Sequence, residues 1–205
     1  SKQYKEDLLD SSPYKNFLKS FTHPFACSTG IDVNEHKKLL EKTGIKTDAK
    51  KHIQNKYFHF EDDKMCLFLF IGDFSDESGV LLIVDSFDEL AKKYENIQFI
   101  VGIKHFYKES SYLKKLDELN KKYPRQFKSI SEGFCDEIAT IMAADYLIIP
   151  RLFEPSGILQ QEAFASGCPV IAFKTGGLTD TVFEYDKEKK NGNGLLFWCH
   201  KNKDY

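Results

Sequence analysis

The sequence predicts an α/β fold, with a parallel sheet covered by helices on both faces. From about residue 66 onward, short apolar runs alternate with longer amphipathic ones, which is the order of βαβ units. Each apolar run is continuous, as in strands that are covered on both faces. A chain of 205 residues with 41% hydrophobic and 29% charged residues suits one globular domain and is too short for a large multidomain enzyme.

The elements of this α/β region follow from residue type and spacing. Leu82, Ile83 and Phe87 recur at helical spacing within residues 79–94, and leucines recur beside lysines within residues 110–123. Two further helices are expected at residues 134–144 and 158–166. Six runs rich in β-branched or aromatic residues predict strands at 66–71, 98–103, 127–130, 146–150, 169–173 and 194–198.

The first 65 residues have a different pattern. Short helices are expected at residues 4–9 and 14–21, broken at Pro13 and Pro24, and a third at residues 48–55. Residues 52–64 mix aromatic and charged side chains without a clear period. We therefore expect a lead-in segment that packs on the α/β core.

Charge and composition narrow the class of partner. Lys and Arg total 29 against 31 Asp and Glu, so the formal net charge of −2 argues against nucleic acid or an anionic membrane as the partner. No apolar run approaches the roughly 20 residues of a membrane-spanning helix. The first residues carry no secretory signal. A small-molecule partner is expected.

The cysteines and histidines point to a reducing environment without a metal site. The five cysteines form no CxxC pair and the six histidines have no metal-ligand spacing, so no bound metal is expected. Cys66 and Cys168 lie in apolar runs, where a free thiol acts as a small buried hydrophobe. We expect an intracellular, reducing compartment, cytoplasm or plastid. The first residue is not Met, which suggests that the chain is a piece of a longer protein.

The most informative loop follows the expected strand at residues 146–150. In an open parallel sheet, ligands bind beyond the carboxyl ends of the strands. This loop contains Glu154-Pro155-Ser156-Gly157, and Glu162 follows Glu154 by eight residues, or two helical turns. Both carboxylates are therefore expected to face one cleft. Amides near Ser156, Gly157 and Ile158 at a helix start form an anion site that suits a nucleotide diphosphate.

Four motifs in order resemble a known family. They are the Glu154 loop with Glu162, the run of residues 163–170, Thr175-Gly176-Gly177-Leu178, and Gly192-Asn193-Gly194; the segment Gly30-Ile31-Asp32 precedes them. Together they resemble the carboxyl-terminal domain of retaining, two-Rossmann-domain glycosyltransferases, and glycogen and starch synthases in particular. The likeness covers roughly residues 28–198. It implies a Rossmann-like donor-binding domain at residues 28–205, interdomain lead-in helices at residues 1–27, and an amino-terminal acceptor domain absent from this chain.

The resemblance also implies an activity and a set of site residues. Such enzymes move glucose from ADP- or UDP-glucose to an α-1,4-glucan with retention of configuration, and need no cofactor besides the nucleotide-sugar donor. Glu154 would contact the transferred sugar and stabilise charge at its anomeric centre, and Glu162 would accept hydrogen bonds from the ribose. The other donor-binding residues implied are Ser156, Gly157, Ile158, Gly176 and Gly177 for the diphosphate or sugar, Asp73 and Ser78 beside the leaving diphosphate, and Phe134 beside the base.

Two positions depart from the family pattern. Asp73 and Ser78 stand where the family usually has Arg and Lys, the cations that neutralise the leaving diphosphate. Charge-assisted contacts in a shielded site are worth about 1.5–3 kcal/mol each, so losing two would slow transfer roughly a hundredfold or more. Nearby cations that would compensate are Lys104, Arg151 and Lys174.

Three alternatives stay open at this stage. The first is a degenerate glycosyltransferase domain that has kept only a binding or regulatory role. The second is a transferase of related fold with another acceptor, such as sucrose, a lipid or a protein. The third is that each glycine-rich turn is structural, which is the preferred interpretation for Gly192-Asn193-Gly194. No Gly-x-Gly-x-x-Gly follows a strand, which argues against a hydride-transfer enzyme.

Overall fold

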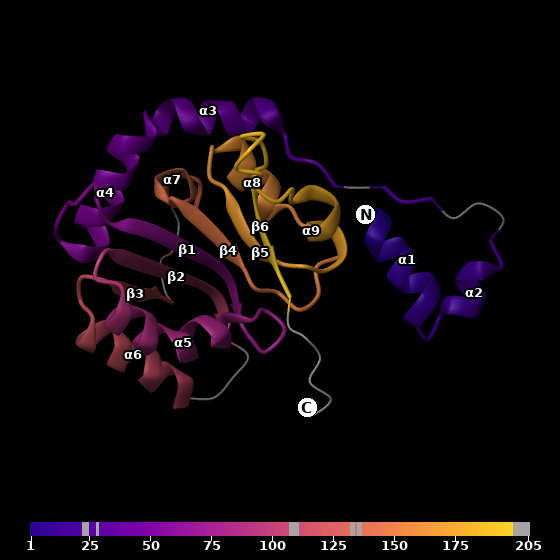
Figure 1. The fold of residues 1–205 in the computed structure, drawn as a ribbon, viewed down its shortest axis with the longest axis horizontal. Helices are drawn as coiled ribbons and strands as arrows, with labels where there is room; N and C mark the ends of the chain where they lie inside the picture. Colours follow the sequence, from indigo (N-terminus) through magenta and orange to yellow (C-terminus); the bar gives the residue numbers. More distant parts are fainter. Residues whose placement is uncertain (22–24, 28, 107–110, 132–133, 135–136, 199–205) are drawn as a thin grey trace.

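The sheet sets the architecture. The computed structural model describes residues 1–21, 25–27, 29–106, 111–131, 134 and 137–198. Within them lies a parallel sheet of order β3-β2-β1-β4-β5-β6, which confirms the predicted Rossmann-like α/β fold (Figure 1). The strand order reverses between β1 and β4, which makes this the switch point where α/β sheets bind ligands. The strands are β1 (Cys66–Phe74), β2 (Ile97–Phe106), β3 (Phe127–Ile130), β4 (Tyr146–Ile149), β5 (Val170–Phe173) and β6 (Gly194–Phe197).

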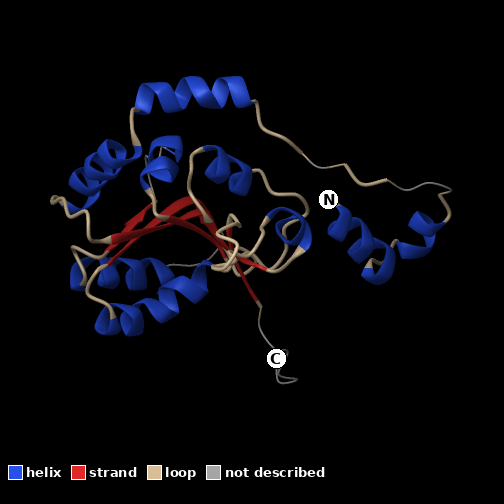
Figure 2. Cartoon of the chain, turned by 45° about the horizontal axis from the view of Figure 1, so that its top comes forward, coloured by secondary structure: helices blue, strands red, loops and turns tan. Residues whose placement is uncertain are grey.

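Helices cover both faces of the sheet, as Figure 2 shows from a second side. The helices α5 (Val80–Lys93) and α6 (Ser111–Lys122) pack on one face. The other face is covered by α4 (Lys46–Phe58), α7 (Glu137–Ala143) and α8 (Leu159–Ala165). Each face therefore has its own buried hydrophobic cluster.

These two clusters explain why the strand sequences are continuously apolar. In β1, Leu67, Leu69 and Ile71 belong to the cluster beneath α4 and α7, whereas Phe70 and Phe74 belong to the cluster beneath α5. Successive side chains of a strand point to opposite faces. A strand buried on both faces therefore needs an apolar residue at almost every position.

Two helices lie outside the sequence predictions. The helix α3 (Val33–Thr43) follows the lead-in, and α9 (Gly176–Thr181) begins at the glycine pair after β5. The sequence of α3 is largely polar, and most of its described side chains are exposed. In α9, the two glycines indicate a turn, and Figure 1 places this short helix beside β5.

The lead-in contacts the carboxyl-terminal part of the fold. The predicted helices appear as α1 (Lys2–Ser11) and α2 (Lys15–Lys19), and α1 packs against α9. The amide of Gln3 donates a hydrogen bond to Asp180 Oδ2 at 3.1 Å, and the ring of Tyr4 lies edge-on to Phe153 with 5.3 Å between centroids. A domain boundary after residue 27 stays a prediction.

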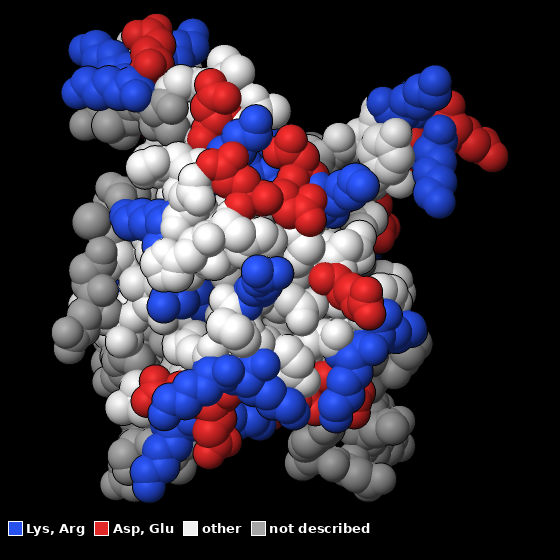
Figure 3. All heavy atoms as spheres, turned by 90° about the vertical axis from the view of Figure 1, so that its left-hand side faces the viewer, with Lys and Arg blue, Asp and Glu red and all other residues white. Residues whose placement is uncertain are grey.

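Charges of both signs are interspersed on the face of the molecule in Figure 3. On the α5 side, Lys122 of α6 forms an ion pair with Asp88 of α5, and Lys92 forms a second one with Asp88 within α5. Hydrogen bonds from both lysines lower the pKa of the Asp88 carboxyl group. Among the described residues, every helix is too short or too polar to cross a membrane.

Candidate active site

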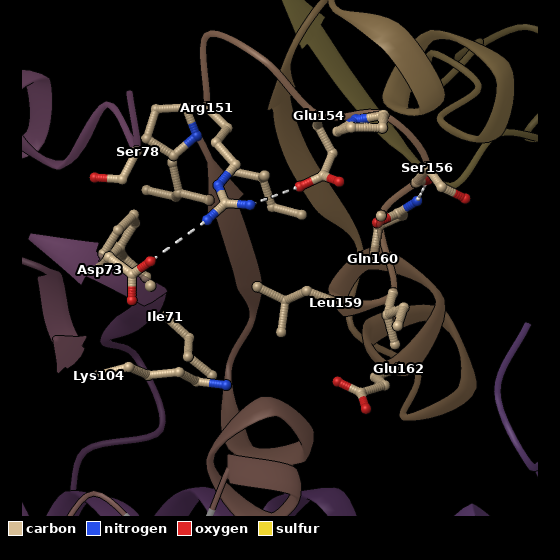
Figure 4. Close-up of a pocket in the computed structure, with 18 of the residues that line it drawn as sticks. Ile71, Asp73, Ser78, Lys104, Arg151, Glu154, Ser156, Leu159, Gln160 and Glu162 are labelled. Carbon is tan, nitrogen blue, oxygen red and sulfur yellow. Dashed lines mark hydrogen bonds and ion pairs between the residues drawn. The ribbon is translucent and has the colours of Figure 1, made fainter. Parts of the chain in front are cut away.

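A pocket of about 540 Å³ lies at the carboxyl ends of β1 and β4. This is the edge where the strand order reverses, as the position of the Glu154 loop predicts. Figure 4 shows that one wall comes from β1, the loop after it and β2, and the opposite wall from the β4–α8 loop and α8. The polar and charged side chains that line it include Asp73, Ser78, Lys104, Glu137, Arg151, Glu154, Ser156, Gln160 and Glu162.

The two carboxylates of the resemblance share this pocket. Glu154 lies in the loop and Glu162 on α8, and Figure 4 shows them on the same wall, with Ser156 farther from the opposite wall. Arg151 Nη1 donates to Glu154 Oε2 at 3.1 Å, and the Glu154 side chain is only 15% exposed. Both acids thus line one ligand-sized cavity, while their individual roles stay predictions. The interval between them is not two helical turns as expected, because α8 begins only at Leu159 and the residues before it form the loop.

Burial sets the protonation behaviour of Glu162. Burial raises the pKa of its carboxyl group, the nearby Glu137 raises it further, and His36 and Lys104 oppose the shift. The Ser166 hydroxyl donates to the Glu162 carbonyl oxygen at 2.8 Å and lies 3.0 Å from His36 Nε2. Both contacts of this hydroxyl are satisfied together when Nε2 of His36 carries the proton and donates to it.

His36 corrects one expectation. From the sequence, which shows no ligand or partner for it, His36 is expected to be solvated, but its side chain is buried because α3 packs against α7 and α8. The contact that buries it joins residues 36 and 166, which lie far apart in sequence. No local pattern signals such a contact.

The turn before α8 offers backbone donors. The amides of Gly157 and Ile158 donate no hydrogen bond to any described residue. The Ser156 hydroxyl, in contrast, contacts Thr29, whose amide and hydroxyl lie 3.2 and 2.7 Å from it. Because α8 is only seven residues long, we attribute the anion-binding capacity of this turn to the two amides rather than to a helix dipole.

The glycine pair of α9 supports the Glu154 loop from behind. A Cβ atom on Gly176 would lie 2.1 Å from the Glu154 carbonyl oxygen, and one on Gly177 would lie 2.3 Å from the Ser156 carbonyl oxygen. The amide of Gly177 donates to that Glu154 oxygen at 2.8 Å. In place of the expected ligand contact, the Gly177 amide is therefore used within the protein, because the backbone of α9 approaches the loop too closely for any side chain.

The positions that depart from the family occupy the opposite wall. Asp73 lies at a register irregularity between β1 and β2, and its Oδ2 is 4.0 Å from Arg151 Nη2. Ser78 is 2% exposed; its hydroxyl donates to the Ser75 carbonyl oxygen at 2.8 Å and accepts from the Val80 amide at 3.3 Å. Ser78 thus stabilises the turn before α5.

Phe134 is not among the residues that line the pocket. Its ring packs on β2, where a Cβ atom on Gly102 would come within 2.8 Å of it, and it is half-buried beside the cluster under α4. A contact with the base stays a prediction, and this placement gives it no support.

Two lining residues were missed by sequence reasoning. Gln160 is fully buried and its Nε2 donates to the Ser156 carbonyl oxygen at 2.9 Å, which fixes the turn that carries the free amides. Glu137 pairs with Lys104 at 2.9 Å across the rim of the pocket. Gln160 reads as an ordinary polar helix residue, and Glu137 as an ordinary acid in a first helical turn, so neither position carries a sequence signal.

Comparisons with known proteins show the family to which the chain belongs. A family model described as glycosyl transferases group 1 matches residues 50–205. A glycogen synthase of Mycoplasma mobile is 35% identical over 171 residues, which cover 81% of this chain and 33% of that protein. The chain thus spans about a third of the length of the curated relatives it matches.

Solved structures confirm the fold. The catalytic domain of starch synthase IV from Arabidopsis thaliana, bound to ADP and acarbose, superposes with a TM-score of 0.81 at 20% identity, covering 99% of this chain and 45% of that one. An Anabaena protein in complex with UDP and glucose gives a TM-score of 0.61 at 20% identity, covering 82% of this chain and 41% of that one. With the family model matching most of its length, the chain belongs to the glycosyl transferase group 1 family.

Proposed function

We propose that this chain is the donor-binding domain of a glycosyltransferase that moves glucose from ADP- or UDP-glucose to an α-1,4-glucan with retention of configuration. The observation that carries the proposal is that Glu154, Glu162 and the free amides of Gly157 and Ile158 meet in one pocket at the switch point of the sheet. These groups match the three parts of a nucleotide sugar: ribose, diphosphate and hexose.

In this proposal each part of the donor has its own place in the pocket. The Glu162 carboxylate accepts hydrogen bonds from the ribose hydroxyls, and the amides of Gly157 and Ile158 donate to the diphosphate. The hexose then lies toward Glu154. Positive charge develops at the anomeric carbon as the bond to the diphosphate breaks, and the carboxylate of Glu154 stabilises it. Because that side chain is only 15% exposed, water screens the interaction less than it would at the surface.

Relatives and neighbours support this substrate class. The curated relatives include glycogen synthases, one solved neighbour was bound to ADP and another to UDP with glucose. The chain covers only a third of such relatives, so an amino-terminal domain that holds the α-glucan acceptor is part of the proposal. Free thiols at Cys66 and Cys168 support a reducing compartment.

The open pocket favours a catalytic over a degenerate domain. Its volume of about 540 Å³ is within the range of small-molecule sites, and both carboxylates line it. Burial raises the pKa of Glu162 and so opposes its ionisation. A bound donor offsets this cost, whereas a domain that had lost its donor would keep two acids on one cavity without that benefit.

Transfer of labelled glucose by the full-length protein tests the proposal. With ADP-glucose or UDP-glucose as donor and glycogen as acceptor, Glu154→Gln should lower kcat by about a hundredfold or more while nucleotide affinity changes little. The matched control is Glu188→Gln, an exposed carboxylate that does not line the pocket. Unchanged transfer by Glu154→Gln, or no transfer by the parent protein from either donor, would contradict the proposed function.

A further inference from the structure

The charged side chains of the pocket disfavour a diphosphate unless a cation faces it. Two cations and four carboxylates line the pocket in the described part of the chain, which gives a formal charge of −2. A nucleoside diphosphate is itself negative, and like charges repel strongly in a shielded site. These six residues are Asp73, Lys104, Glu137, Arg151, Glu154 and Glu162.

Two of the three candidate cations are poorly placed for this task. Lys104 Nζ is held by both carboxylate oxygens of Glu137, at 2.9 and 3.1 Å, and lies at the end of the pocket toward Glu162 (Figure 4). Lys174 is exposed, its ammonium lies 5.5 Å from the centre of the Trp198 ring, and it is not among the residues that line the pocket.

Arg151 is placed between the two walls. Figure 4 shows its guanidinium spanning the gap from Asp73 to Glu154. Nη1 donates to Glu154 at 3.1 Å, but Nη2 is 4.0 Å from Asp73 Oδ2, which is beyond hydrogen-bond distance. A guanidinium has five N–H donors in a planar fork that matches phosphate, so most of its donors remain for a ligand.

We propose that Arg151 is the cation that binds the diphosphate of the donor, and that Asp73 competes with the diphosphate for it. This inference rests on the proposed function. It means that the positive charge missing from positions 73 and 78 is supplied from the opposite wall, by the residue that follows β4 and Pro150. Because the same guanidinium contacts Glu154, binding of the diphosphate and orientation of the sugar-facing carboxylate depend on one side chain.

Titration of the 205-residue chain tests the assignment. Its sheet is covered on both faces by its own helices, and thermal unfolding checks that each variant folds. The ligands are ADP, UDP, adenosine and uridine, so that the diphosphate contribution is separated from that of the nucleoside. Arg151→Gln should weaken binding of the preferred diphosphate by about tenfold or more and leave nucleoside affinity within about twofold. Arg151→Lys should give an intermediate loss.

A double-mutant cycle tests the competition by Asp73. Asp73→Asn should tighten diphosphate binding about threefold or more, and this gain should be at least about twofold smaller when Arg151 is already Gln. The matched control is Lys174→Gln, which removes one positive charge outside the pocket and should have little effect.

The outcomes separate the two proposals. If the unaltered chain binds neither diphosphate, the proposed function itself fails. If it binds one of them and Arg151→Gln binds equally well, or Lys174→Gln loses as much, the role of Arg151 is refuted and the proposed function stands. If Asp73→Asn tightens diphosphate binding equally with and without Arg151, Asp73 repels the ligand directly. That result would refute the proposal that Asp73 competes with the diphosphate for Arg151.

Discussion

The two walls of the pocket are equally well fixed by their backbones but differ in chemistry. On the α8 wall, Gly176 and Gly177 allow the backbone of α9 to touch the Glu154 loop. On the β1 wall, the turn before α5 is held just as closely, because a Cβ atom on Gly79 would lie 2.1 Å from the Pro150 carbonyl oxygen. The first wall has the family's acidic motif, whereas the second has Asp73 and Ser78 in place of cations. Shape and charge are therefore set separately in this site.

The largest effect on stability is expected where the backbone of α9 touches the α8 wall. Gly177→Ala should lower the free energy of unfolding by about 3 kcal/mol, because the added methyl group would meet the Ser156 carbonyl oxygen, a backbone atom that cannot rotate away. The control is Gly167→Ala, whose Cβ meets nothing within 4 Å but whose φ of +70° strains the backbone by about 1 kcal/mol. Chemical unfolding measures both. Equal losses would show that the close approach of α9 to the loop does not matter.

A smaller loss of stability is expected on the β1 wall when the buried Ser78 is replaced by the lysine that the family usually has there. Ser78→Lys should lower the free energy of unfolding by about 1–2 kcal/mol, because it removes two hydrogen bonds of the turn and places a charge at a 2% exposed site. Asp73→Arg, at a position with a 29% exposed side chain, should fold normally and tighten ADP or UDP binding. A stable Ser78→Lys with tighter binding than Asp73→Arg would reverse this ranking.

The smallest effect on the free energy of unfolding is expected for Glu162, the carboxylate on α8, and this effect depends on pH. Because the pKa of Glu162 is raised in the folded protein, its contribution to stability is fully present below the ordinary glutamate pKa of about 4.3 and is lost as the pH rises through the raised value. Glu162→Gln does not titrate, so it should be slightly more stable than the parent chain at pH 7.5, by less than about 1 kcal/mol.

Denaturant unfolding at several pH values measures this difference, which should shrink as the pH falls toward 4. The same variant should bind nucleosides less tightly, since it loses a carboxylate acceptor for the ribose. A variant that is less stable than the parent at pH 7.5, with unchanged nucleoside affinity, would mean that Glu162 is structural.

Local sequence patterns predicted most of the fold. The continuous apolar runs correspond to β1 through β6, because strands buried between two helical layers have to be apolar at consecutive positions. The helix α3 was missed because its described side chains are mostly exposed, and α9 because a glycine pair reads as a turn. Both helices are stabilised by neighbours distant in sequence, which a local pattern cannot show.

The site was predicted less completely than the fold. Glu154 and Glu162 are close in the sequence, and both line one pocket as expected. Arg151 lies between the walls beside Asp73, which is 78 positions earlier in the sequence. The Gly177 amide donates to the carbonyl oxygen of Glu154, which is 23 positions earlier. Only the folded chain brings such groups together.

Amide chemical shifts test the central claim most directly. Titration of the isotope-labelled chain with ADP, UDP and their glucose conjugates should give saturable binding in the millimolar range or tighter for one nucleotide. The amide signals of Gly157 and Ile158 should move most, and that of Gly177 little, because its hydrogen bond to Glu154 is retained. Unmoved signals at Gly157 and Ile158 with all four ligands, in a chain whose spectrum shows that it is folded, would contradict the claim that this turn binds a nucleotide sugar.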